Sequence, residues 1–144
     1  NVRGICCLRP GVPSVSETIE VVSIIDRYLE HARVVYFRNG GHGEIYLSSA
    51  DWMVRNLDKR LETLFPVVSD DRQKRLRKIL RTYFRDNVKA RRLLPDGSWE
   101  PVNTQGDRVR SQEACWREAV AAVRASENEG PQFRPIRNPD RGEP

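Results

Sequence analysis

His31 and Arg33 are the side chains whose types and spacing best suit phosphate chemistry in this sequence. They stand two positions apart, so a strand through them would place both side chains on one face. A neutral imidazole can exchange a proton or attack phosphorus, and a guanidinium binds phosphate oxygens in a bidentate manner. A structural histidine at the start of a strand is the alternative interpretation. The other histidine, His42, lies among glycines and is expected in a solvated turn.

A short polar segment, Ser48-Ser49-Ala50-Asp51, could complete such a site. Hydroxyl and carboxylate oxygens at the end of a strand can orient a histidine ring by accepting its hydrogen bond. Ser49 or Asp51 could equally cap a following helical turn. The spacing does not choose between these two interpretations.

Positive charge is concentrated between residues 72 and 92. This stretch holds ten Lys and Arg residues against one acid, Asp86. It predicts either a solvated helix face or a surface that follows phosphate groups. Few aromatic residues are interleaved, so recognition of single-stranded nucleic acid is not supported. The sequence contains neither a P-loop nor Cys and His pairs at zinc spacing.

Both strands and helices must position these groups. Stretches rich in β-branched and aromatic residues predict strands at 2–8, 19–25, 33–37, 44–47, 60–65, 88–94 and 99–102. Turn residues predict hairpins at 39–43 and 95–98. Apolar residues at helical spacing predict helices over 70–85 and 110–125, with Ser111 as a candidate N-cap, and a helical turn is expected at 26–30. The result is an α/β fold with a mixed sheet flanked by helices.

The composition bounds the class of protein. The chain has 144 residues, a net charge of +5, 38% hydrophobic and 31% charged residues, which suits one ordinary domain with an anionic partner. No apolar run approaches the roughly 18–20 residues that span a bilayer, and the first residues lack a signal-peptide pattern. Three cysteines, two of them adjacent, favour free thiols in a reducing, cytoplasmic compartment.

The two ends of the sequence differ in character. It opens on Asn1 and becomes apolar at once, so we expect a fragment of a longer polypeptide. From residue 126 onward prolines and polar residues dominate, and a disordered tail over 126–144 is expected. The folded domain is therefore predicted over residues 1–125.

Several motifs resemble type 1 polyphosphate kinase, in its carboxy-terminal domain, the second of two phospholipase-D-like lobes. The resemblance covers residues 1 to about 92 with specific motifs and extends more loosely through the last helix. The motifs are R-G-I-C-C-L-R-P-G-V-P at 3–13, D-R-Y-L-E-H at 26–31, Y-L-S-S-A-D-W-M at 46–53 and R-N at 55–56.

The resemblance implies a reaction and a set of site residues. The family transfers the terminal phosphoryl group of ATP reversibly to polyphosphate, with magnesium, through a phosphohistidine on a preceding lobe that this chain lacks. His31 matches a second active-site histidine, associated with ATP and a candidate general acid or base, and Arg3 matches an arginine that binds nucleotide phosphates. Supporting roles are expected for Arg33, Asp51, Arg55 and Asn56.

The same resemblance sets expectations for the assembly. The partners would be ATP or ADP, polyphosphate and the remaining domains of the enzyme, in a homo-oligomer that is cytoplasmic or peripheral to the membrane. The isolated chain is expected to be inactive. No residue here is identifiable as a magnesium ligand.

The sequence departs from the general phospholipase D signature, H-x-K followed by an Asp and a G-S-x-N-like segment. Arg33 stands for the Lys, Arg38 for the Asp, and Ser48-Ser49-Ala50-Asp51 for the last segment. Polyphosphate kinases resemble this sequence in the same departures. A phosphodiesterase is therefore disfavoured, and the main alternative is a basic nucleic-acid-binding module.

Overall fold

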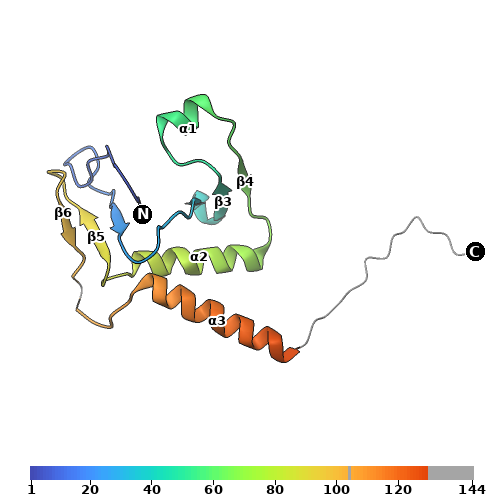
Figure 1. Ribbon diagram of the computed structural model, residues 1–144. Helices are drawn as coiled ribbons and strands as arrows, with labels where there is room; N and C mark the ends of the chain where they lie inside the picture. Colours follow the sequence, from blue (N-terminus) through green and yellow to red (C-terminus); the bar gives the residue numbers. More distant parts are fainter. Residues whose placement is uncertain (104, 130–144) are drawn as a thin grey trace, which may run out of the picture.

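The strands form two separate antiparallel sheets in the computed structural model, which describes residues 1–103 and 105–129 (Figure 1). One sheet has the order β1-β5-β6 and contains β1 (Val22–Ile24), β5 (Ala90–Leu93) and β6 (Trp99–Pro101). The other has the order β2-β3-β4 and contains β2 (Val34–Phe37), β3 (Glu44–Ser48) and β4 (Leu64–Pro66). The predicted α/β class is confirmed. The prediction of a single mixed sheet is wrong, because β1 pairs with the distant β5, whereas β2 pairs with β3 in a second sheet.

Both predicted hairpins are present. Asn39 and Gly40 adopt positive φ angles of 40° and 61° in a short 3-10 turn, η1 (Asn39–Gly41), which reverses the chain between β2 and β3. The second hairpin turns at Gly97, with a φ of 89°, and joins β5 to β6. Glycine and asparagine adopt positive φ more easily than other residues. Their presence at 39–41 and 97 is the reason that the sequence predicts both turns.

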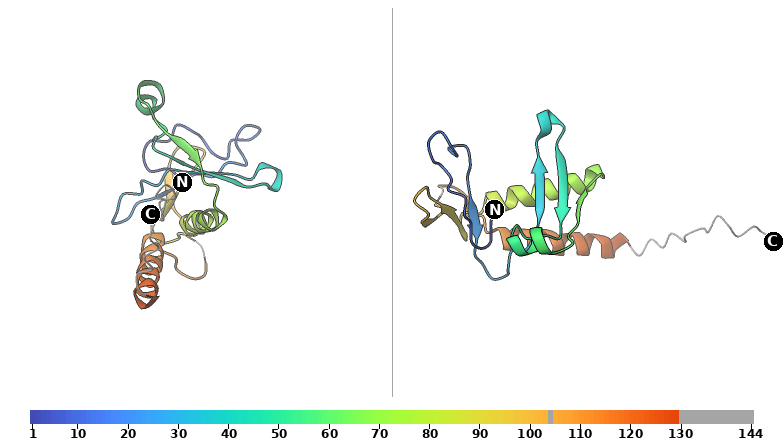
Figure 2. Two further views of the ribbon diagram at one scale, coloured as in Figure 1. Left: turned by 90° about the vertical axis from the view of Figure 1, so that its right-hand side faces the viewer. Right: turned by 90° about the horizontal axis from the view of Figure 1, so that it is seen from above.

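Three helices complete the described fold: α1 (Val54–Lys59), α2 (Asp70–Phe84) and α3 (Ser111–Glu129). The view in Figure 1 places α2 between α3 and the β2-β3-β4 sheet, while α1 stands off the rest of the molecule (Figures 1 and 2). The predicted helix over 70–85 is confirmed. The last helix passes the predicted boundary at 125 and continues to Glu129, and residues 130–144 lie outside the described part of the chain.

Three local predictions were wrong. Residues 2–8 form no strand, because Gly4 has a φ of 141° and only the Val2 amide reaches β1, at the Val22 carbonyl. Residues 26–30 form no helical turn. The strand predicted over 60–65 is short and begins at Leu64. The segment before it contains α1, which begins at Val54, where a helical turn after Asp51 was one of the two open interpretations.

The buried apolar core of the described residues is small. It consists of Val21, Ile24, Ile45, Ala50, Ala90 and Leu93. Five polar residues are as deeply buried: Ser16, Ser23, Asn56, Asp86 and Ser111. Among them, Asp86 and Ser111 are hydrogen-bonded to each other. Ser111 was a candidate N-cap, but its hydroxyl donates to Asp86 instead of capping α3.

Candidate functional site

The start of β2 and the end of β3 bring His31, Arg33 and Asp51 together. Arg33 directly precedes β2, and its carbonyl accepts a hydrogen bond of 3.0 Å from the amide of Ser48 at the end of β3. Asp51 lies three residues beyond Ser48, where the chain bends away from the sheet. The hairpin therefore carries the two partners, 18 residues apart, to one place.

These three side chains form a compact cluster. The Nε of Arg33 donates to Oδ1 of Asp51 at 2.7 Å, and Nη2 of Arg33 lies 2.5 Å from Nε2 of His31. His31 Nε2 is 3.5 Å from the same Asp51 oxygen. The arginine thus links the carboxylate to the imidazole, and the His31 ring remains about half exposed to solvent.

Electrostatics favour the charged forms of the ion pair. The hydrogen bond from Arg33 lowers the pKa of Asp51, and the reciprocal hydrogen bond to Asp51 raises the pKa of Arg33. The carboxylate of Glu62 acts on Arg33 in the same direction. The Ser49 hydroxyl donates a hydrogen bond to Glu62. Ser49 therefore orients the Glu62 carboxylate and not the His31 ring. Neither Ser49 nor Asp51 caps α1, whose N-cap is Met53 with no side-chain hydrogen bond.

Asn56 stabilises the backbone at Asp51, next to the cluster. Its side chain is buried and its Nδ2 donates to the carbonyl of Asp51 at 3.2 Å. Its Oδ1 is buried without a hydrogen-bond partner. Arg55, on the same helix, and Arg3 are exposed, and in the described part of the chain no hydrogen bond or ion pair links either of them to His31, Arg33 or Asp51. His42 is exposed at the end of η1, as expected for a solvated turn.

The segment that carries His31 is attached to the start of α3. Arg110 donates to both carboxylate oxygens of Asp26, at 2.7 and 2.6 Å. Gln112 accepts from the Tyr28 amide at 3.0 Å, and its Nε2 donates to the Tyr28 carbonyl at 2.8 Å and to Glu30 at 2.7 Å. We call these contacts the α3 clamp. It explains why residues 26–30 are held in an irregular conformation and form no helical turn.

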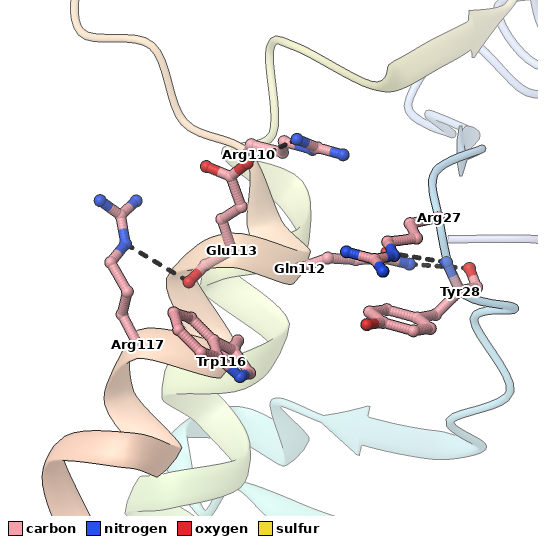
Figure 3. A pocket seen from close by; sticks show the side chains of 7 residues that line it. All are labelled: Arg27, Tyr28, Arg110, Gln112, Glu113, Trp116 and Arg117. Carbon is pink, nitrogen blue, oxygen red and sulfur yellow. Dashed lines mark hydrogen bonds and ion pairs between the residues drawn. The ribbon is translucent and has the colours of Figure 1, made fainter.

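Sequence reasoning missed the clamp. Its partners lie 82 to 84 residues apart, and no local pattern connects them. A shallow pocket of about 500 Å³ lies over it (Figure 3). Its lining is Arg27, Tyr28, Arg110, Gln112, Glu113, Trp116 and Arg117.

A magnesium ion does not fit the cluster. Mg²⁺ prefers carboxylate oxygens together with waters and substrate phosphates. Asp51 is the carboxylate that lies 3.5 Å from His31, and its Oδ1 already accepts the hydrogen bond from Arg33. Within 1–103 and 105–129 there is no group of three or more His, Cys, Asp or Glu residues that could hold a metal ion.

Comparison with known proteins decides the family. Residues 1–112 match the family model described as "Polyphosphate kinase C-terminal domain 2". The chain belongs to this family. The match covers β1 to β6, the cluster around His31 and the first residues of α3 that form the clamp.

Individual polyphosphate kinases are similar over most of this chain. The Rhodopirellula baltica "Polyphosphate kinase" is 54% identical over 130 residues, which cover 89% of this chain and 15% of the relative. The Chlorobaculum tepidum "Polyphosphate kinase 1" is 56% identical over 112 residues, 78% of this chain and 16% of the relative. The crystal structure of polyphosphate kinase from Porphyromonas gingivalis has a TM-score of 0.78 at 40% identity, over 85% of this chain and 19% of that one.

This polyphosphate kinase domain therefore spans less than a fifth of the proteins it matches. The structural match confirms the α/β fold of the polyphosphate kinase C-terminal region. Within the described part of the chain, no helix is both long and apolar enough to cross a bilayer.

Proposed function

We propose that this domain forms the phosphate-binding side of a polyphosphate kinase active site. The enzyme would transfer the terminal phosphoryl group of ATP reversibly to polyphosphate through a phosphohistidine on a preceding lobe. The observation that supports this most directly is the His31–Arg33–Asp51 cluster in a chain that belongs to the family. ATP, ADP, polyphosphate and the remaining domains of the enzyme are the proposed partners.

The chemistry of phosphoryl transfer fits such a cluster. The transferred group spreads negative charge over its equatorial oxygens, and catalysis depends on fixed cations and donors that stabilise this charge. Arg33 uses two of its five N–H donors on His31 and Asp51, which leaves three for phosphate oxygens. In the proposal His31 contacts a phosphoryl oxygen as a donor or as a general acid or base, and Arg3 binds nucleotide phosphates.

Further features of the proposal come from the family resemblance. Magnesium would arrive with the nucleotide phosphates, and no step is assigned to it on these residues. Arg55 and Asn56 would support the site, Asn56 by holding the Asp51 bend. A cytoplasmic homo-oligomer is the expected assembly, and the isolated domain is expected to be inactive because it would lack the phosphohistidine.

The test is a chimera in which this chain replaces the matching segment of the Chlorobaculum tepidum polyphosphate kinase. We expect ATP-dependent polyphosphate synthesis by the chimera, and a loss of about 10²-fold or more in the His31→Ala variant. Arg75→Ala, on the exposed side of α2, is the matched control and should keep full activity. Full synthesis by His31→Ala would remove His31 from the mechanism.

A further inference from the structure

The contacts of the His31 ring determine where its proton lies. A guanidinium carries only donors, and Arg33 places Nη2 at 2.5 Å from Nε2 of His31. If Nε2 carried a proton, its N–H group would face the N–H group of Arg33 and no hydrogen bond could form. Nε2 must therefore be unprotonated and accept the hydrogen bond from Arg33 with its lone pair. A neutral ring in this position carries its single proton on Nδ1. Among the described residues, no hydrogen bond is formed at Nδ1, and the ring is about half exposed on its other edges.

Arg33 is itself held in place. Its side chain is only 25% exposed and donates from Nε to Asp51 at 2.7 Å. Asp51 is positioned by the buried amide of Asn56, which binds its carbonyl, and by the β2-β3 pairing. The donor that faces His31 is therefore fixed by an ion pair and by the sheet.

We propose that the Arg33–Asp51 pair holds His31 as the neutral tautomer protonated on Nδ1, and that this Nδ1–H group binds a phosphoryl oxygen. Asp51 is then a positioning residue that acts through Arg33 and His31, and Arg33 both positions His31 and keeps its remaining donors for the same phosphate. The identity of the bound phosphate rests on the proposed function, whereas the tautomer rests on the cluster alone.

This arrangement chooses between the two roles left open for His31. A general base needs a free lone pair, and the one on Nε2 is used by Arg33. A neutral ring that gave up its Nδ1 proton would become an imidazolate, which is strongly unfavourable near neutral pH. His31 therefore orients and stabilises a phosphoryl group as a hydrogen-bond donor and does not carry a proton between reactants.

A competing arrangement involves the charges around the ring. If His31 were protonated on both nitrogens, its Nε2–H could donate to Asp51 Oδ1, which lies 3.5 Å away, and Arg33 would have to move off the ring. The ring thus has the Asp51 carboxylate oxygen at 3.5 Å and the Arg33 guanidinium nitrogen at 2.5 Å from the same Nε2 atom. The two arrangements differ in the protonation of Nε2, which nitrogen spectroscopy can measure.

The experiment records long-range ¹⁵N–¹H correlations of the histidine rings in the complete, ¹⁵N-labelled chain at about pH 7.5, above the ordinary pKa of an imidazole. The chain has only two histidines, so His42→Gln assigns the spectrum. We expect a protonated Nδ1 and an unprotonated Nε2 for His31. Arg33→Met should shift the ring towards the Nε2-protonated form, and Arg75→Met should leave the pattern unchanged.

An Nε2-protonated or doubly protonated His31 in the unaltered chain overturns the proposal, even if Arg33→Met does not fold. Asp51→Asn provides a second variant, in which Arg33 loses its anchor and the Nδ1-protonated population should fall. Tripolyphosphate is the ligand probe. Its addition should shift the His31 Nδ1 resonance in the unaltered chain, and Arg33→Met should weaken its binding about tenfold or more. An unchanged Nδ1 resonance contradicts phosphate binding by this group.

The tautomer and the proposed function can fail separately. If the spectrum shows the Nδ1-protonated ring but the chimera with His31→Ala keeps full polyphosphate synthesis, the proposed function is wrong and the tautomer stands. If His31→Ala abolishes synthesis but the ring is protonated on Nε2, the tautomer is wrong and the function stands.

Discussion

Asp86 is a buried carboxylate at the junction of three elements. Its Oδ1 accepts from the amides of Val88, Lys89 and Ala90, and its Oδ2 accepts from the amide and hydroxyl of Ser111. Burial by itself raises the pKa of Asp86, but the hydrogen bonds outweigh burial and the pKa is lowered. The carboxylate thereby joins the end of α2, the start of β5 and the first turn of α3.

Replacing Asp86 should cost a large part of the domain's stability. Asp86→Asn removes the charge and places an NH₂ group against donors, so we expect the free energy of unfolding to fall by about 3 kcal/mol. Urea denaturation measures this loss. Asp107→Asn, at an exposed position, is the control and should change stability by less than about 0.5 kcal/mol.

The same carboxylate predicts the acid dependence of folding. A group whose pKa is lowered by folding stabilises the protein above its unfolded pKa of about 3.9, and this contribution is lost as the pH falls through the folded value. The stability of the unaltered domain should therefore decline below about pH 4, and the decline should be shallower in Asp86→Asn. Equal slopes in the two proteins would contradict this role for Asp86.

At the scale of elements, the α3 clamp couples the last helix to the segment that carries His31. Asp26 has a side chain only 2% exposed, and the hydrogen bonds from Arg110 lower its pKa. Gln112 binds the backbone of Tyr28 on both its N–H and C=O sides, as a neighbouring strand would. An irregular segment is thus kept ordered by one helix terminus.

Breaking the clamp should loosen this segment while the sheets stay folded. In the double variant Arg110→Ala, Gln112→Ala, amide hydrogen exchange over residues 26–33 should become about tenfold faster or more, because charge-assisted bonds are removed. Arg117→Ala is the matched control, since the Arg117 side chain donates to the Glu113 carbonyl of its own helix. Unchanged exchange in the double variant would show that the clamp does not order the segment.

At the scale of the whole molecule, the segment around α1 exposes many large apolar side chains. Eight of them between residues 52 and 68 are at least half exposed: Trp52, Met53, Val54, Leu57, Leu61, Leu64, Phe65 and Val68. We call these eight residues the α1 apolar residues. Large exposed apolar side chains are the groups that interaction surfaces bury. The chain spans less than a fifth of its relatives, so further polypeptide is available in them to cover these side chains.

The α1 apolar residues should make the isolated chain associate. We expect sedimentation velocity to show concentration-dependent association, and Leu61→Lys with Val68→Lys to reduce it, since both side chains are more than four-fifths exposed. Val15→Lys, at a 78% exposed position outside the 52–68 segment, is the control and should not reduce association. A monomer at all concentrations would contradict the prediction.

The basic side of α2 tests the nucleic-acid alternative. Lys74, Lys78, Arg81 and Arg85 recur at helical spacing and are exposed, and Lys74 and Lys78 have acidic partners in Asp71 and Glu118. Among the side chains described in residues 1–103 and 105–126, no carboxylate forms an ion pair with Arg81 or Arg85. These two arginines are the cations of this stripe available to an external polyanion.

Arg81→Gln with Arg85→Gln should weaken polyphosphate binding, and the slope of its salt dependence should fall by about one for each phosphate that is no longer neutralised. Arg72→Gln with Arg75→Gln removes the same charge from another side of α2 and is the control. Filter binding of polyphosphate and duplex DNA across a salt series measures both effects. Tighter and more salt-resistant binding to DNA would favour the nucleic-acid-binding module.

The sequence alone was sufficient where structure depends on neighbouring residues. Turn residues at 39–43 and 95–98 predicted both hairpins, and helical spacing predicted α2 and most of α3. His31, Arg33 and Asp51 were candidates by residue type, and the β2-β3 hairpin that unites them was predicted as well. The motifs also identified the family, which the comparisons confirm.

Only the tertiary structure decided the features that join distant parts of the chain. The division into two sheets follows from the pairing of β1 with β5, and the conformation of residues 26–30 follows from partners up to 84 residues away. The irregular conformation of residues 2–8 and the burial of Asp86 likewise depend on what surrounds them. Local periodicity does not reveal such pairings, because residues far apart in the sequence become partners only when the chain folds. The protonation state of a side chain depends on those partners, so it too is decided only in the folded chain.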